Sequence, residues 1–163
     1  MGKSAKKGLI YVLTGILLPG LLLVLFFAGK QGESAQKIIT KEDREEIWAV
    51  IRNAVEDNTW WEANNRKEVK KILAQYYAEP LLDKISNDAW NFISQPTDWY
   101  WQAHVKKIII RRQIKDTVLV HADLELTDLI SNQIEQGKAE YVMKKTKEGW
   151  RIHIVRYQWP RQT

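Results

Sequence analysis

The chain opens with a long apolar segment, because residues 9–28 contain no charged side chain. Twenty helical residues, at about 1.5 Å each, cover the roughly 30 Å hydrocarbon layer of a bilayer. A cleavable signal peptide has a shorter apolar region followed by small residues, and Phe27 and Glu33 stand where small residues are required. We therefore predict a transmembrane signal-anchor over residues 9–29, with a cleaved signal peptide as the alternative.

The residues on either side of this segment predict its orientation. Lys3, Lys6 and Lys7 precede it, and positive charges beside a span are retained in the cytoplasm. We expect residues 1–8 to be a cytoplasmic basic tail and residues 30–39, which are small and polar, to be a linker. Residues 40–163 then form an extracytoplasmic domain of a single-pass protein in the cell membrane.

Three amphipathic helices are predicted after the linker. Thr40 followed by Asp43 resembles a capping box, and apolar residues then recur at helical spacing. A second helix begins after Asn64-Asn65, and Pro80 suits the first turn of a third. The predicted ranges are about 41–57, 65–77 and 80–92.

The periodicity falls to two after Pro96, where β-branched residues dominate. The clearest strand carries Val118, Val120, Ala122, Leu124 and Leu126 on one face. Glu148-Gly149 predicts a tight hairpin turn, because glycine readily adopts positive φ. The predicted strands are 104–114, 118–126, 138–145 and 150–158, with a longer polar connection at 128–136. Segregated helices and strands indicate an α+β domain, with three helices packed on a curved antiparallel sheet of about four strands.

Charge and composition narrow the possible functions. The net charge is +5 over 163 residues, but Lys3, Lys6 and Lys7 account for three of these charges. Part of the basic pI therefore comes from lysines that orient the predicted membrane span, and we expect no nucleic-acid partner. The absence of cysteine excludes disulfides, thiolate metal sites and a catalytic thiol.

The last strands and one helix junction carry a family resemblance. Residues 137–159 read GKAEYVMKKTKEGWRIHIVRYQW, and the junction contains Tyr76-Tyr77 and Pro80-Leu81-Leu82. This pattern resembles the NTF2-like superfamily over roughly residues 40–160, which implies helices packed in the concavity of a bent sheet. The anchored layout is similar to the inner-membrane assembly factors of type IV secretion and conjugation machines, and to short membrane-bound bacterial NTF2-like proteins.

Candidate catalytic residues are few. Enzymes of this superfamily place an acid or base in the cone, whereas the inward face of residues 118–126 carries none. His104 is the best candidate if a catalytic residue exists, followed by His153, Tyr141 and Tyr157. The three histidines fall on different strands, so we predict no metal site. Because the inward face also lacks an acid or base, we predict no catalysis, and we expect no cofactor.

Aromatic residues are the most unusual feature, with eight tryptophans in the chain. They either fill the cone or wall a pocket for a small apolar ligand. The candidate pocket residues are Trp60, Trp61, Tyr76, Tyr77, Trp90, Trp99, Trp101 and His104.

A basic strand is the second candidate surface. Its residues are Lys106, Lys107, Arg111, Arg112 and Lys115. They form either a solvated outer face that discourages edge aggregation or a contact face for anionic lipid headgroups, wall polymers or an acidic protein.

The leading hypothesis is a non-catalytic, membrane-tethered interaction domain, acting in its own oligomer or in a bacterial envelope complex. The first alternative is an extracytoplasmic module that binds a small ligand in an aromatic pocket. The second is an isomerase- or dehydratase-like enzyme.

Overall fold

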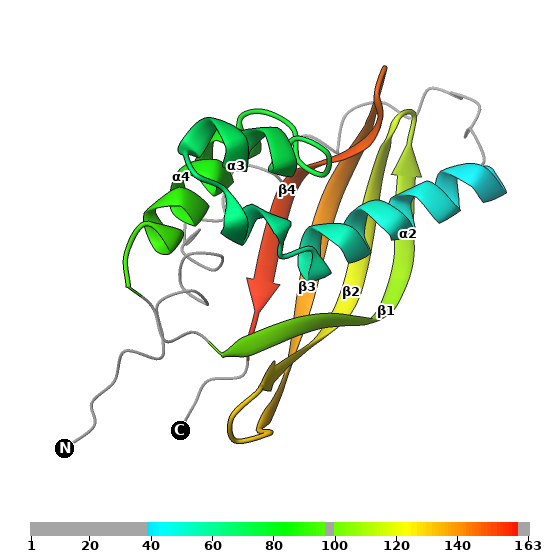
Figure 1. The fold of residues 1–163 in the computed structure, drawn as a ribbon. Coiled ribbons are helices and arrows are strands. Elements are labelled where there is room, and N and C mark those ends of the chain that lie inside the picture. The colour runs from blue at the N-terminus through cyan, green and yellow to red at the C-terminus, as the bar shows by residue number, and fades with distance from the viewer. Residues whose placement is uncertain (1–38, 97–99, 160–163) are drawn as a thin grey trace, which may run out of the picture.

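The computed structural model describes residues 39–96 and 100–159, which form an α+β domain (Figure 1). The helical part consists of α2 (Lys41–Glu56), the 3-10 helix η2 (Thr59–Glu62), α3 (Arg66–Leu73) and α4 (Leu81–Ile93). The strands are β1 (Trp101–Ile114), β2 (Thr117–Asp128), β3 (Ile134–Thr146) and β4 (Gly149–Gln158). Three α-helices followed by four strands confirm the fold class predicted from the periodicity.

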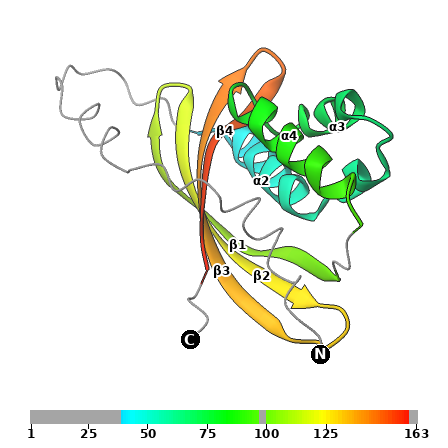
Figure 2. The same cartoon turned by 90° about the vertical axis from the view of Figure 1, so that its left-hand side faces the viewer.

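The four strands form one antiparallel meander in the order β1-β2-β3-β4. Figure 2 shows the sheet bent strongly, with α2, α3 and α4 all on its concave side. Thr146 pairs with Gly149, so the β3–β4 turn lies where the sequence predicts it, and Gly149 has φ +104°. The elements therefore enclose a cone, with the sheet as its outer wall.

The concave face of the sheet is the core of the domain. Val118, Val120, Ala122, Leu124 and Leu126 are all buried, which confirms the predicted inward face of β2. They pack with the buried faces of the helices, which include Ile47, Ile51, Val69 and Leu73. Burial of these side chains, at about 1.5 to 3 kcal/mol each, provides most of the stabilisation.

Acidic side chains of α2 hold this helix against the sheet. Thr40 caps the helix by accepting a hydrogen bond from the Asp43 N–H at 3.1 Å, as the sequence indicates. The Asp43 side chain is buried and accepts from the Trp150 indole Nε1 at 2.9 Å and from the Lys145 ammonium. Glu46 accepts the backbone N–H of Trp150 at 2.8 Å. Acidic residues in the first turns of α2 therefore bind the β3–β4 hairpin. This contact adds to the favourable interaction between negative side chains and the positive N-terminal end of the helix dipole.

The C-terminal end of α2 is held by β1. The Glu56 carboxylate accepts the Val105 N–H at 2.9 Å, next to the register shift between Val105 and Lys107. A bulge leaves one backbone N–H out of the strand ladder and bends the strand. Glu56 satisfies a donor at that bend.

Several sequence predictions need correction. Helix α3 ends at Leu73 instead of near Tyr77, because the next residues pair with β4: Ile152 N–H donates to the Tyr76 carbonyl at 2.8 Å. This pairing covers the free edge of β4. The β2–β3 connection is shorter than the predicted 128–136, since Asp128 still belongs to β2 and β3 begins at Ile134. Helix η2 was not predicted.

The predicted transmembrane span, residues 9–29, lies outside the described residues, as do the tail and most of the linker. Within 39–96 and 100–159, no helix is both long and apolar enough to cross a membrane.

We predict that Asp43→Asn lowers the free energy of unfolding by about 1–3 kcal/mol at neutral pH, because Lys145 and the buried indole lose a charged acceptor. Chemical denaturation of the full chain measures this change. Glu45→Gln is the matched control: its exposed carboxylate lies 3.7 Å from Lys41, and such pairs contribute little.

The effect of this substitution depends on pH. Hydrogen bonds from Lys145 and then Trp150 hold the pKa of Asp43 below its ordinary value of 3.8. A carboxylate with a lowered folded-state pKa stabilises fully above its unfolded pKa, and this stabilisation is lost as the pH falls through the folded pKa. The difference between wild type and Asp43→Asn therefore shrinks below about pH 3.8. A difference that stays constant from neutral pH into acid contradicts this assignment.

Candidate functional site

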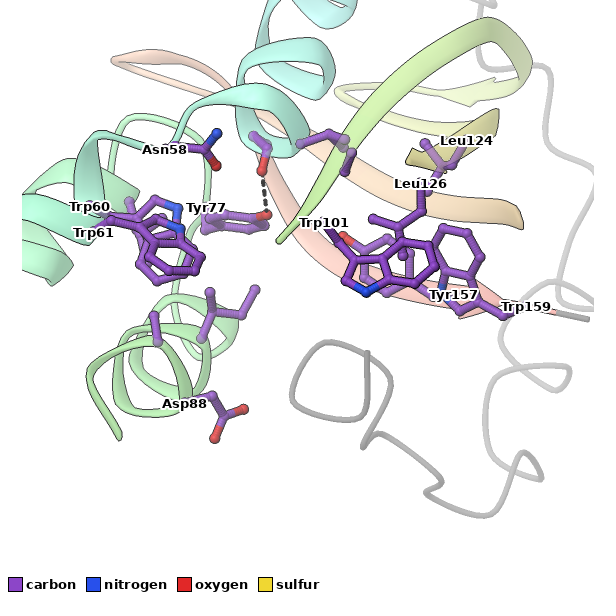
Figure 3. Close-up of a pocket in the computed structure, with 16 residues that line it drawn as sticks. Asn58, Trp60, Trp61, Tyr77, Asp88, Trp101, Leu124, Leu126, Tyr157 and Trp159 are labelled. Carbon is purple, nitrogen blue, oxygen red and sulfur yellow. Dashed lines mark hydrogen bonds between the residues drawn. The ribbon is translucent and has the colours of Figure 1, made fainter. Parts of the chain in front are cut away.

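A cavity of about 110 Å³ lies inside the cone between the helices and the end of the sheet. Figure 3 shows its walls, with Trp60, Trp61 and Tyr77 on the helical side and Trp101, Tyr157 and Trp159 on the sheet side. The remaining apolar lining residues are Ala54, Val55, Leu73, Ile85, Ala89, Ala103, Leu124 and Leu126. Asn58 and Asp88 also line it.

The helical wall is fixed by the turn that follows α2. Asp57 accepts the Thr59 N–H at 2.8 Å and the Tyr76 hydroxyl at 2.6 Å, which positions the start of η2. Trp61 then packs edge-on against Phe92 of α4, with ring centroids 5.2 Å apart and an interplanar angle of 80°. This edge-to-face contact is a favourable aromatic geometry and orients the Trp61 ring at the cavity wall.

The sheet wall depends on a glycine. A Cβ atom at Gly137 of β3 would lie 2.4 Å from Cε3 of Trp159, so the indole rests directly on the backbone of β3. Only glycine leaves space for such close contact within a strand. Gly137 therefore determines where this wall of the cavity stands.

Three tyrosines meet at the base of the cavity. Tyr77 and Tyr157 line it, and Tyr141 of β3 is fully buried, with its ring at 88° to that of Tyr157 and a centroid distance of 6.3 Å. The Tyr77 hydroxyl donates to the Ala54 carbonyl at 3.3 Å (Figure 3). Burial raises the pKa of each of the three hydroxyls. All three are therefore neutral at physiological pH.

The structure brings together some of the eight predicted pocket residues. Trp60, Trp61, Tyr77 and Trp101 line the cavity, whereas Trp99 lies outside the described residues.

The other three predicted pocket residues are placed elsewhere. Tyr76 turns toward Asp57, and burial followed by this hydrogen bond raises the pKa of its hydroxyl to about 12. Trp90 packs against the core without lining the cavity, and His104 Nδ1 lies 4.0 Å from Glu56 Oε1, also away from the lining.

Sequence reasoning omitted Tyr157 and Trp159 from the pocket. On β4, Trp150 and Ile152 face the core, but the register shift opposite Val142 and Met143 changes the alternation. Beyond that bulge, odd-numbered residues of β4 face inward. The aromatic side chains at positions 157 and 159 could have suggested a place in the pocket. Their orientation depends on the bulge in β4, which the sequence pattern does not reveal.

The predicted basic face is interrupted by acids. Lys106 pairs with Glu125 at 3.2 Å, and Lys107 and Arg111 line a groove on the outer side of the sheet beside Asp123 and Glu140. Arg112 and Lys115 are exposed near the β1–β2 turn. These five residues therefore do not make a continuous surface of positive charge.

The domain has the cystatin-like fold that the NTF2-like resemblance implies. A candidate aromatic ring hydroxylase from Novosphingobium aromaticivorans is similar with a TM-score of 0.51 and 12% identity, over 74% of this chain and 91% of that one. A protein of unknown function with a cystatin-like fold from Nostoc punctiforme is similar with a TM-score of 0.54 and 10% identity, over 75% and 94%. No family model matches the sequence, and no curated protein matches it. Identities this low establish the fold alone.

We predict that Gly137→Ala destabilises the domain, although alanine normally suits a strand better than glycine. The added Cβ would displace the Trp159 ring from the cavity wall. Thermal unfolding and tryptophan fluorescence measure the two effects.

The double variant Gly137→Ala/Trp159→Ala is the control for this prediction. If the contact with Trp159 is the cause, Gly137→Ala lowers Tm less when Trp159 is already absent, as in a double-mutant cycle. An equal loss of Tm in both backgrounds contradicts the contact.

Proposed function

We propose that this domain binds a small, mostly apolar ligand in the aromatic cavity of its cone. The observation that carries the proposal is the cavity itself: four tryptophans and two tyrosines border a volume of about 110 Å³ that their side chains leave unfilled. Protein interiors are normally packed to crystal-like density, with few voids larger than a water molecule. Apolar cavities of roughly 150 Å³ bind molecules such as benzene, so this volume suits a ligand of about one ring.

The character of the wall supports binding without catalysis. Among the described residues that line the cavity, Asp88 is the one with a charged side chain, and its carboxylate pairs with Lys84 at 3.2 Å. His104, the leading catalytic candidate from the sequence, is not part of the lining. A general acid or base has to reach the reacting atoms, and neither residue is placed to do so freely.

Filling the cavity tests this function. Ala103 of β1 lines the cavity, and Ala103→Leu adds three heavy atoms there. In the full chain, ethylbenzene is expected to raise the Tm of the wild type, because a ligand that binds only the folded state stabilises it by mass action. Ala103→Leu is expected to abolish that increase.

The matched control is Gln102→Leu, which adds a leucine at the neighbouring, exposed position of β1. This variant is expected to respond to ethylbenzene as the wild type does. Ethylbenzene that leaves the wild-type Tm unchanged, or raises it equally in Ala103→Leu, argues against ligand binding in the cone.

The second candidate function is the membrane-tethered interaction domain, held at the membrane by residues 9–29. An exposed apolar tip favours it, and we define this tip by Tyr100, Leu129, Ile130 and Ile134, which are 50–67% exposed. The Leu129 N–H donates to the Tyr100 carbonyl at 2.7 Å, which joins the β2–β3 loop to the start of β1. Clustered exposed apolar residues are typical of protein contact sites.

The loop that presents this tip is well ordered by Asp128. The buried Asp128 carboxylate accepts the N–H groups of Ile130 and Ser131 at 2.8 and 3.1 Å, and its own N–H donates to the Gln133 carbonyl at 2.8 Å. A loop fixed in this way loses little conformational entropy when a partner binds. The loop exposes Leu129 and Ile130 to solvent, where their side chains add nothing to the packing of the core.

Crosslinking in intact membranes tests the second function. The double variant Leu129→Ser/Ile130→Ser is expected to lose a crosslinked species that the wild type forms, with little change in Tm because both side chains are exposed. Trp48→Ser is the control, since Trp48 is an exposed apolar residue of α2 away from the tip. A wild type that forms no crosslinked species, or a double variant that retains it, counts against this role.

A further inference from the structure

The exposed side of α2 carries a stripe of aromatic and basic residues. Arg44, Trp48 and Arg52, which we name the α2 stripe, follow one another at intervals of four residues and therefore lie along one flank of the helix. All three side chains are exposed, Trp48 by 42%. Neither guanidinium has an ion pair with any residue that the structure describes.

The acidic residues of α2 lie on other flanks or are already bound. Glu46 binds the backbone of the β3–β4 hairpin, and Glu42, four residues earlier, shares its flank. Glu56 binds the backbone of β1. Glu45 borders the α2 stripe, but its carboxylate lies 3.7 Å from the Lys41 ammonium. The unpaired charges of the stripe are therefore both positive.

The place of α2 in the chain brings this stripe near the predicted membrane surface. The linker, residues 30–39, joins the predicted span to Thr40, the N-cap of α2. This linker extends over at most about 35 Å, and it carries Lys30 and Lys37 against one acid, Glu33. Helix α2, with 16 residues, is about 24 Å long. The whole helix therefore has the reach to lie along the bilayer from which the chain emerges.

The side chains of the stripe match the headgroup region of a bilayer. Arginine forms paired hydrogen bonds with phosphate oxygens. Tryptophan is enriched at the membrane–water interface, because its ring is apolar and its N–H is polar. An acidic protein offers carboxylates to the same arginines, but the short linker keeps lipid phosphates at a high local concentration beside them. The bilayer is therefore the favoured partner of this stripe.

We infer that the α2 stripe docks the domain on anionic lipid headgroups of the membrane that holds the chain, with Arg44 and Arg52 on lipid phosphates and Trp48 in the interface. This inference rests on the membrane tether of the second candidate function and adds a direct contact between the domain and the lipid. The apolar tip lies at the opposite end of the sheet from the β3–β4 turn that α2 binds. Docking through α2 therefore leaves the tip available to a protein.

Fluorine NMR of the full chain in lipid nanodiscs tests the inference. Fluorotryptophan replaces tryptophan, and a gadolinium-chelating lipid broadens signals that lie near the bilayer. The Trp48 signal is assigned by its absence in Trp48→Phe, and the reference is Trp90 of α4, assigned in the same way.

The lipid composition and the salt concentration are then varied. In discs of phosphatidylcholine and phosphatidylglycerol in equal parts, we expect Trp48 to be broadened more than Trp90. We expect a smaller difference in discs of phosphatidylcholine alone. The difference is also expected to shrink at about 1 M salt, where the Debye length falls to about 3 Å.

Removing the two cations of the stripe measures their contribution. Each basic residue near an anionic surface favours the bound state by about fivefold, so Arg44→Gln/Arg52→Gln is expected to lower the ratio of docked to undocked domain by about 25-fold. The relaxation rate of the Trp48 signal reports this ratio. The Tm is expected to change little, because both side chains are exposed and have no ion pair among the described residues.

The matched control is Lys67→Gln/Lys71→Gln, which removes the same charge from α3. Both lysines are exposed and, within the described part of the chain, have no ion pair. Helix α3 packs against α4 and η2, whereas α2 packs against β1 and β4 (Figure 1). This variant is expected to leave the broadening of Trp48 unchanged.

The outcomes distinguish this inference from the tether on which it rests. Equal broadening of Trp48 and Trp90 in anionic discs, or an equal loss in the two double variants, overturns docking through the stripe. A crosslinked species that is lost in Arg44→Gln/Arg52→Gln, with Trp48 broadening unchanged, assigns the stripe to an acidic protein and overturns lipid docking. Each of these results leaves the tether intact, whereas a full chain that does not enter nanodiscs overturns the tether and this inference together.

Discussion

The fold depends on one buried carboxylate. Asp43 lies near the start of α2, and its contacts with Lys145 and Trp150 span more than a hundred residues of sequence. Trp150 is among the largest fully buried side chains, and its indole N–H finds its acceptor in this carboxylate. A buried charge is tolerated only when its hydrogen-bonding capacity is used, so this contact fixes both the angle of α2 and the position of the β3–β4 hairpin.

The fixed position of α2 has a consequence at its other end. Glu56 meets β1 at the bulge beside Val105, where the strand bends away from the helix. Trp101 and Ala103, which precede this bulge in β1, line the cavity together with residues of η2 and α4. The cavity therefore lies beside the contact that holds the C-terminal end of α2 to β1, and aromatic residues line it without filling it.

Stability and binding make opposite demands on this cavity. The core beneath it is well packed, and Ser86, although buried and polar, is satisfied by the Leu82 carbonyl at 2.6 Å. The aromatic walls of the cavity instead border a volume of about 110 Å³ that the described side chains do not fill. An open aromatic cavity beside a well-packed core is more consistent with a binding site than with loose packing.

The sequence by itself determined the class of fold, the order of the elements, the inward face of β2, the Thr40 cap and the turn at Gly149, because each follows from local periodicity or backbone preference. It also indicated that Trp60, Trp61, Tyr77 and Trp101 belong to one aromatic site. Only the tertiary structure decided that Tyr157 and Trp159 join them, that Tyr76, Trp90 and His104 do not, and that Asp43 is a buried anchor. The physical reason is that bulges change which face a residue occupies, and that the partner of a buried polar group can lie a hundred residues away. Neither effect is present in the spacing of side chains along the chain.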